Sequence, residues 1–144
     1  DTAIAIEHNI AGIYISNHGG RQLDHGRGTL DVLPEVVKEV GGKAKIFIDG
    51  GISRGTDIVK AIVMGADAVG IGKLQGLALG AAGVPGLVRV LEILEMEVEE
   101  CLGLMGATSY ADVAPSQLFP DAPIVTEPHV LSAYPLLNLE DEGY

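Results

Sequence analysis

The sequence predicts an α/β protein built on a parallel sheet. Three short, apolar, β-rich runs, at 12–16, 45–48 and 68–72, alternate with stretches whose apolar residues recur at helical spacing. Strands that alternate with helices form parallel sheets through right-handed crossovers. Each run is apolar throughout, as expected of a strand buried on both faces, and each ends in a polar or glycine-rich loop.

Helices are expected between and after these strands. Residues 30–40 place aliphatic side chains on one face, and a pair of glycines follows them as a stop signal. Thr56 or Asp57 is expected to open the next helix. A longer helix is predicted over about 86–105, and residues 1–10 resemble the second half of a helix.

Composition and charge argue against several kinds of partner. The formal net charge of -11 at pH 7 disfavours nucleic acid and anionic membrane surfaces, both of which need a basic face. Glycines and a proline interrupt the longest apolar run, 77–88, so no membrane segment is predicted. Cys101 is the single cysteine and indicates no disulfide, and we expect a cytoplasmic protein. The histidines are not at metal-ligand spacing, so no metal site is predicted.

The loop after the first strand combines a base with a cation. It reads Ser16-Asn17-His18-Gly19-Gly20-Arg21-Gln22. A histidine at a strand end can accept a proton near neutral pH, and an arginine offers a planar fork that fits a carboxylate. Such a pair fits proton removal from a 2-hydroxy acid. The alternative is a structural loop in which His18 caps backbone groups and Arg21 pairs with Asp24.

The next two loops form a candidate phosphate site. They read Asp49-Gly50-Gly51-Ile52-Ser53-Arg54 and Gly70-Ile71-Gly72-Lys73. Backbone N–H groups of glycine-rich turns, a helix start and a cation together bind phosphate. Loops after the last two strands of a (β/α)₈ barrel are a common place for such a site. By themselves these loops are also similar to those of IMP dehydrogenase and other phosphate-binding barrels.

Residues 16–22 resemble the active-site signature of the FMN-dependent 2-hydroxy-acid dehydrogenases and oxidases. This family includes glycolate oxidase, lactate oxidases and mandelate dehydrogenase, and the resemblance extends over about residues 11–113. It implies a (β/α)₈ TIM barrel in which the three strands are the sixth, seventh and eighth. It also implies FMN as cofactor and oxidation of a small 2-hydroxy acid to the 2-oxo acid. His18 would be the catalytic base, and Arg21 would bind the substrate carboxylate.

The same resemblance implies a set of cofactor-binding residues. Ser16 would lie near the flavin, and the remaining members would hold the phosphate and the ribityl chain: Asp49, Gly50, Gly51, Ser53, Arg54, Gly72 and Lys73. Two positions depart from the family, which usually has arginine where Ser53 and Lys73 stand. Lysine still supplies a point charge to a phosphate, whereas serine supplies one neutral hydrogen bond.

The chain is expected to be part of a larger enzyme. Residues 1–114 would form part of the barrel, and residues 115–144, with five of the seven prolines, a proline-rich C-terminal tail. Three strand–helix units are fewer than half of those in a barrel of about 250 residues, so we expect a fragment that is inactive in isolation. The parent protein is expected to be a homo-oligomer.

Two other functions remain open on the sequence alone. One is a different phosphate-binding barrel, such as an IMP-dehydrogenase-like enzyme, which would have no need of the His18–Arg21 pair. The other is a non-catalytic half-barrel that binds phosphate or flavin, which the short length favours.

Overall fold

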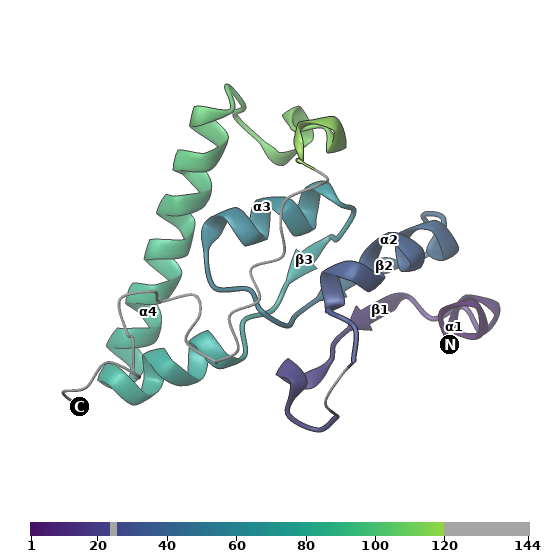
Figure 1. Cartoon of the computed structure of the whole chain (residues 1–144), viewed down its shortest axis with the longest axis horizontal. Coiled ribbons are helices and arrows are strands. Elements are labelled where there is room, and N and C mark those ends of the chain that lie inside the picture. The colour runs from purple at the N-terminus through teal and green to yellow at the C-terminus, as the bar shows by residue number, and fades with distance from the viewer. Residues whose placement is uncertain (24–25, 120–144) are drawn as a thin grey trace.

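Three parallel strands form one sheet in the order β1-β2-β3 (Figure 1). The structure is a computed structural model that describes residues 1–23 and 26–119. The strands are β1 (Gly12–Ile15), β2 (Lys45–Ile48) and β3 (Ala68–Val69). The predicted parallel sheet is confirmed, but β3 ends three residues earlier than the sequence indicates. Gly70 still donates from its backbone N to the Ile48 carbonyl (2.8 Å), and the chain then turns away into a helix.

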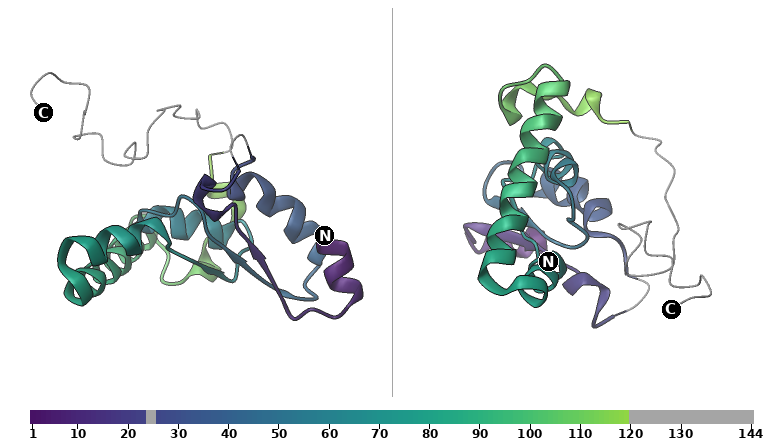
Figure 2. Two further views of the ribbon diagram at one scale, coloured as in Figure 1. Left: turned by 90° about the horizontal axis from the view of Figure 1, so that it is seen from below. Right: turned by 90° about the vertical axis from the view of Figure 1, so that its left-hand side faces the viewer.

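Helices precede, connect and follow the strands. They are α1 (Thr2–Glu7), α2 (Thr29–Val40), α3 (Gly55–Val63) and α4 (Lys73–Leu104), with the 3₁₀ turns η1 (His18–Gly20), η2 (Tyr110–Asp112) and η3 (Pro115–Gln117). In Figure 1 and in the left view of Figure 2, α1 and α4 lie at opposite ends of the sheet. The alternation of strand and helix predicted from the sequence is therefore present.

The main core lies between one face of the sheet and helices α2 and α3. Leu33 and Ile48 are fully buried there, and Ile15 is 8% exposed. Because side chains alternate along a strand, Tyr14 and Phe47, paired across β1 and β2, lie on the opposite face. Tyr14 is 58% exposed, so this second face of the sheet is open among the described residues.

The start of α3 differs from the sequence prediction. The helix begins at Gly55 with Arg54 as its N-cap, not at Thr56 or Asp57. Asp57 instead is the third helical residue, and its Oδ2 accepts hydrogen bonds from the backbone N atoms of Ser53 and Arg54, both at 3.0 Å. The carboxylate therefore satisfies N–H groups ahead of the helix, which is why an acidic residue here resembles an opening residue in sequence.

Helix α4 has a break near its start that divides it into two helical segments. Ala82 and Gly83 have non-helical backbone angles, with φ of -151° and 61°, and Pro85 follows. The two segments meet at a marked angle in Figure 1. The sequence prediction of about 86–105 found only the second segment, because the glycines of the first lower its helix propensity.

By length and composition alone, α4 could cross a membrane, and 11% of its most apolar window is buried.

The second segment of α4 packs on α3 and on Val113, which follows the turn η2. Val59, Leu102 and Val113 are buried together, and Cys101 is half-buried beside them, as expected of a structural thiol. Val113 is close to the predicted domain boundary at residue 114, and that boundary stays a prediction. Of the predicted tail, 115–144, only 115–119 is described, and the remainder lies outside the described residues.

Candidate active site

Three loops leave the sheet at the same edge. The parallel register pairs Ile15 with Ile48 and Ile48 with Val69, so the carboxyl ends of all three strands lie side by side. The ladder continues into the second loop, where the backbone N of Asp49 donates to the Ile15 carbonyl at 3.0 Å. In parallel α/β folds this edge is where ligands bind. The predicted site residues are thereby brought to one end of the fold.

The first loop fixes the backbone of His18 in an uncommon conformation. Its φ is 56°, in the left-handed region that non-glycine residues seldom adopt. Two neighbouring side chains support it: Ser16 Oγ accepts a hydrogen bond from His18 N (3.1 Å), and Asn17 Oδ1 accepts one from Gly19 N (3.0 Å). His18 and Arg21 are both exposed at this edge, available to a ligand. Ser16 thus has a defined structural contact in addition to its predicted place near the flavin.

The second loop is held against the first by a residue that the sequence prediction missed. Thr29, at the start of α2, is 5% exposed, and its Oγ1 donates to the Asp49 carbonyl at 2.5 Å. Gly50 has a φ of 94°, and a Cβ there would lie 2.9 Å from Asn17 Oδ1 and 3.0 Å from Thr29 Oγ1. Only glycine therefore permits this close approach of the two loops.

The third loop places the side chain of Lys73 against the first loop. Lys73 begins α4, with Gly72 as the N-cap residue. A Cβ built on Gly19 would lie 3.0 Å from Lys73 Cε, so the lysine side chain rests on the loop that carries His18. A lysine next to a helix N-terminus is a suitable place for an anion.

Arg54 faces α4 and forms an ion pair there. Its Nη2 and Nε lie 2.6 and 2.8 Å from Glu97 Oε1, and the backbone N of Gly55 donates to Glu97 Oε2 at 2.6 Å. The hydrogen bond from Arg54, together with that from Gly55 N, lowers the pKa of Glu97 against the opposing effect of burial. The predicted role of Arg54 in cofactor binding stays a prediction, as does that of Ser53, whose Oγ donates to the Gly51 carbonyl at 3.3 Å.

Asp49 carries an unsatisfied buried oxygen. Its Oδ1 is buried and has no hydrogen-bond partner among the described residues. The hydroxyl of Tyr14 is close to this carboxylate, and the pKa of Tyr14 is raised by desolvation first and then by the charge of Asp49 and a hydrogen bond to it. A buried polar atom in this state calls for a partner, and a bound ligand can provide one.

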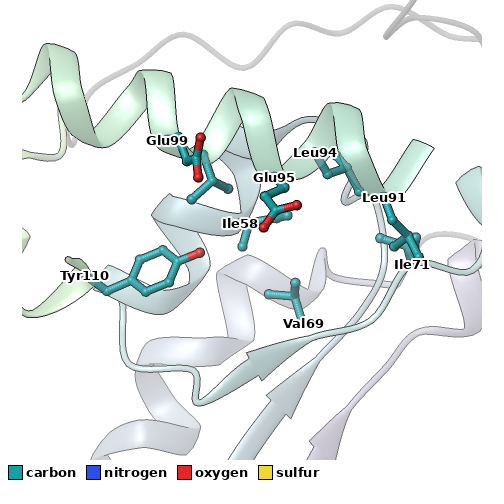
Figure 3. A pocket seen from close by; sticks show the side chains of 9 residues that line it. Ile58, Val69, Ile71, Leu91, Leu94, Glu95, Glu99 and Tyr110 are labelled. Carbon is teal, nitrogen blue, oxygen red and sulfur yellow. The ribbon is translucent and has the colours of Figure 1, made fainter. Parts of the chain in front are cut away.

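A separate apolar groove lies next to the third loop, which contributes Ile71 to its lining. It encloses about 550 Å³ between α3, β3 and α4, and Figure 3 shows Glu95, Glu99 and Tyr110 among its apolar lining. None of the predicted site residues lines it. The groove is therefore not the site that the sequence predicts.

Comparison with known proteins places the chain in a family. The model of the FMN-dependent dehydrogenases matches residues 1–120. The chain is 44% identical over 122 residues to glycolate oxidase 5 of Oryza sativa subsp. japonica, covering 85% of this chain and 33% of that protein. It is 47% identical over 120 residues to an L-lactate oxidase of Nostoc sp., covering 82% and 32%.

Solved structures agree with the sequence relatives. A crystal structure of mandelate oxidase with benzoyl-formic acid has a TM-score of 0.74 at 41% identity, covering 78% of this chain and 33% of that one. The chain belongs to the FMN-dependent dehydrogenase family, a family of flavoprotein oxidoreductases, and FMN is its cofactor. The predicted family and cofactor are confirmed. The chain spans about one third of the length of the curated relatives that it matches.

The loops fit two chemical parts of FMN. Lys73 at the start of α4 provides a positive charge where a phosphate could bind. The buried Oδ1 of Asp49 can accept a hydrogen bond from a neutral hydroxyl, which FMN carries on its ribityl chain. These residues would hold the polar chain of the cofactor.

Proposed function

We propose that the protein containing this chain oxidises a small 2-hydroxy acid to the 2-oxo acid with FMN. His18 is the base, and Arg21 binds the substrate carboxylate. The observation that carries the proposal is the contact between Lys73 and Gly19, the residue next to His18 in the first loop. It supports a site in which His18, Arg21 and Lys73 act on one substrate and cofactor. The relatives named glycolate oxidase and L-lactate oxidase act within this substrate class, as their names state.

Each residue has a defined task in this reaction. The Arg21 guanidinium pairs with the carboxylate through two parallel hydrogen bonds and so orients the substrate. The His18 imidazole then accepts a proton from the substrate. Bound FMN supplies the electron acceptor of the reaction. Ser16 would lie near the flavin. The polar chain of FMN would be held by Lys73, Asp49 and the backbone of Gly50, Gly51 and Gly72, with Ser53 and Arg54 in the same loop as Asp49.

We further propose that the three strand–helix units are the last three of an eightfold barrel. The match to about one third of the mandelate oxidase chain supports this assignment. The open face of the sheet, with Tyr14 and Phe47, would then line the barrel interior. A third of a barrel leaves two sheet edges unpaired, so the isolated chain is expected to be inactive. Homo-oligomerisation of the parent protein and a cytoplasmic location stay predictions.

A flavin titration tests the proposal first. FMN is added to the purified chain, and to a longer protein carrying this sequence, while flavin fluorescence and induced circular dichroism are recorded. Saturable quenching with an induced signal is expected for the longer protein. If neither protein bound FMN, the assignment of this site to FMN would be wrong.

An activity assay then separates catalysis from binding. The longer protein is mixed with glycolate, L-lactate or mandelate and an artificial electron acceptor, and reduction of the acceptor is followed. We expect turnover of at least one of these acids. FMN binding without turnover of any 2-hydroxy acid would instead favour a non-catalytic flavin-binding module.

A further inference from the structure

Tyr14 lies on the open face of the sheet, where an apolar residue would suffice to build a strand. Its ring stacks on that of Phe47, with ring centroids 6.3 Å apart and an interplanar angle of 23°. The two residues are direct partners in the register of β1 and β2. The stacking therefore limits where the Tyr14 hydroxyl can lie.

The hydroxyl of Tyr14 points to the loops that form the candidate site. A Cβ built on Gly70, in the loop after β3, would overlap the Tyr14 hydroxyl oxygen and would lie 3.3 Å from Asp49 Cβ. Residues from β1 and from the loops after β2 and β3 thus meet at one point. The absence of a side chain at Gly70 leaves the space that the Tyr14 hydroxyl occupies.

Asp49 has a hydrogen-bonding capacity that the described residues do not use. A buried carboxylate oxygen without a partner is costly, because it has lost water and gained no donor. Asp49 Oδ1 is in this state among the described residues. A phosphate is a poor partner for this oxygen, because two negative charges in contact repel each other. A neutral hydroxyl is a suitable partner, because it can donate a hydrogen bond to the carboxylate.

We propose that Tyr14 is a positioning residue that holds the Asp49 carboxylate so that its buried Oδ1 accepts a hydrogen bond from a ribityl hydroxyl of the flavin. Phe47 fixes the tyrosine ring, and Gly70 leaves room for its hydroxyl. The inference rests on the proposed function and deepens it. The raised pKa of Tyr14, to which Asp49 contributes, agrees with the geometry.

The test compares three flavins that differ in their side chains. Dissociation constants of FMN, riboflavin and lumiflavin are measured with the chain, or with the longer protein if only that binds flavin. Tyr14→Phe keeps the stacked ring and removes the hydroxyl. We expect it to weaken FMN and riboflavin binding by about tenfold, the loss of one hydrogen bond to a charged group. Lumiflavin, which has no polyol chain, should bind equally to both proteins.

A second variant tests the same contact from its other side. Gly70→Ala places a methyl group where the Tyr14 hydroxyl lies, and the backbone of Gly70 is outside the left-handed region, so alanine is not strained there. It should weaken riboflavin binding in the parent and have little further effect in Tyr14→Phe. Tyr110→Phe is the matched control, because Tyr110 lines the groove outside the site.

A readout without flavin tests the Tyr14–Asp49 contact itself. The phenol absorbance of the protein is titrated with base, and the transition that Tyr14→Phe removes is assigned to Tyr14. Asp49→Asn should move that transition to lower pH, because the negative charge that opposes ionisation is gone.

The outcomes separate the inference from the function on which it rests. Three results would each overturn the inference alone. The first is equal riboflavin affinity in the parent and in Tyr14→Phe. The others are a loss of lumiflavin affinity equal to that of riboflavin, and a Tyr14 transition that Asp49→Asn does not move. Failure of every protein to bind any of the three flavins would overturn the proposed function, and the inference with it.

Discussion

Arg54 and Glu97 join the loop after β2 to the long helix α4. The Arg54 guanidinium lies 2.6 Å from Glu97 Oε1, and the same carboxylate accepts a hydrogen bond from Gly55 N through Oε2. A Cβ on Gly55 would lie 2.5 Å from Glu97 Cβ. The close approach of α3 and α4 at this point therefore requires a residue without a side chain. The ion pair therefore fixes the loop that carries Ser53 relative to the second helical segment of α4.

Glu97→Gln should lower the free energy of unfolding by about 1 kcal/mol at neutral pH, as measured by urea denaturation. The Glu97 side chain is 16% exposed, so its charge is only partly screened. Because folding lowers the pKa of Glu97, its contribution is full above the unfolded value of 4.5 and is lost as pH falls through the folded value. The difference between the two proteins should therefore shrink below about pH 4.5.

Glu92→Gln is the matched control on the same helix. Glu92 pairs with Arg89 at 3.0 Å, but these side chains are 55% and 66% exposed. An exposed pair of this kind contributes roughly 0–1 kcal/mol, so little change is expected. Equal effects of the two substitutions would show that the partly buried contact of Glu97 contributes no more than the exposed one of Glu92.

Lys73→Gln should weaken FMN binding by about tenfold or more, because a charge-assisted contact to the phosphate is lost. Riboflavin, which has no phosphate, should bind as before. Gly19→Ala should act in the same direction, because its methyl group would press on Lys73 and the φ of 66° disfavours alanine. Isothermal titration with both flavins makes the measurement.

Lys43→Gln controls for the loss of a positive charge far from the loops, since Lys43 is exposed and precedes β2 at the opposite edge of the sheet. A fall in riboflavin affinity equal to that for FMN in Lys73→Gln would contradict a phosphate contact.

Local patterns in the sequence predicted the elements and the loops well. The helix expected over 30–40 is observed as Thr29–Val40, because an amphipathic stripe and a glycine stop act within the segment itself. The loops converge as expected, since parallel strands present their carboxyl ends at one edge. His18 and Arg21 could be proposed as site residues because they stand in one contiguous motif, and their roles stay predictions.

Contacts between distant segments could not be predicted in this way. Glu97 lies 43 residues after its partner Arg54, and no periodic signal links them. Thr29 is 20 residues from Asp49 and looks like an ordinary helix start. The position of Tyr14 beside Asp49 depends on the register of three strands, which the sequence alone does not determine.

His18→Asn should lower kcat of the active protein that contains this chain by about 10²–10⁴, the usual contribution of a general base. Asparagine is chosen because it tolerates the left-handed backbone that His18 adopts, so loop distortion is limited. FMN affinity should change little, and steady-state kinetics with a saturating 2-hydroxy acid makes the measurement. His8→Asn, at the exposed end of α1, should leave kcat unchanged. A kcat within tenfold of the parent in His18→Asn would remove the base from this residue.

Arg21→Lys should mainly raise KM for the 2-hydroxy acid, because a bidentate fork becomes a point charge while the net charge stays the same. Arg21 ends the η1 turn, and its backbone N donates to the His18 carbonyl at 3.4 Å, so the two residues belong to one hydrogen-bonded turn. KM is expected to increase by about tenfold or more, because one charge-assisted hydrogen bond is lost.

Arg27→Lys is the matched control. Arg27 pairs with Glu35 at 2.7 Å on the surface, and its replacement should leave KM unchanged. If KM and kcat were unchanged in Arg21→Lys, Arg21 would not bind the substrate carboxylate. Another group would then have to bind the substrate next to His18.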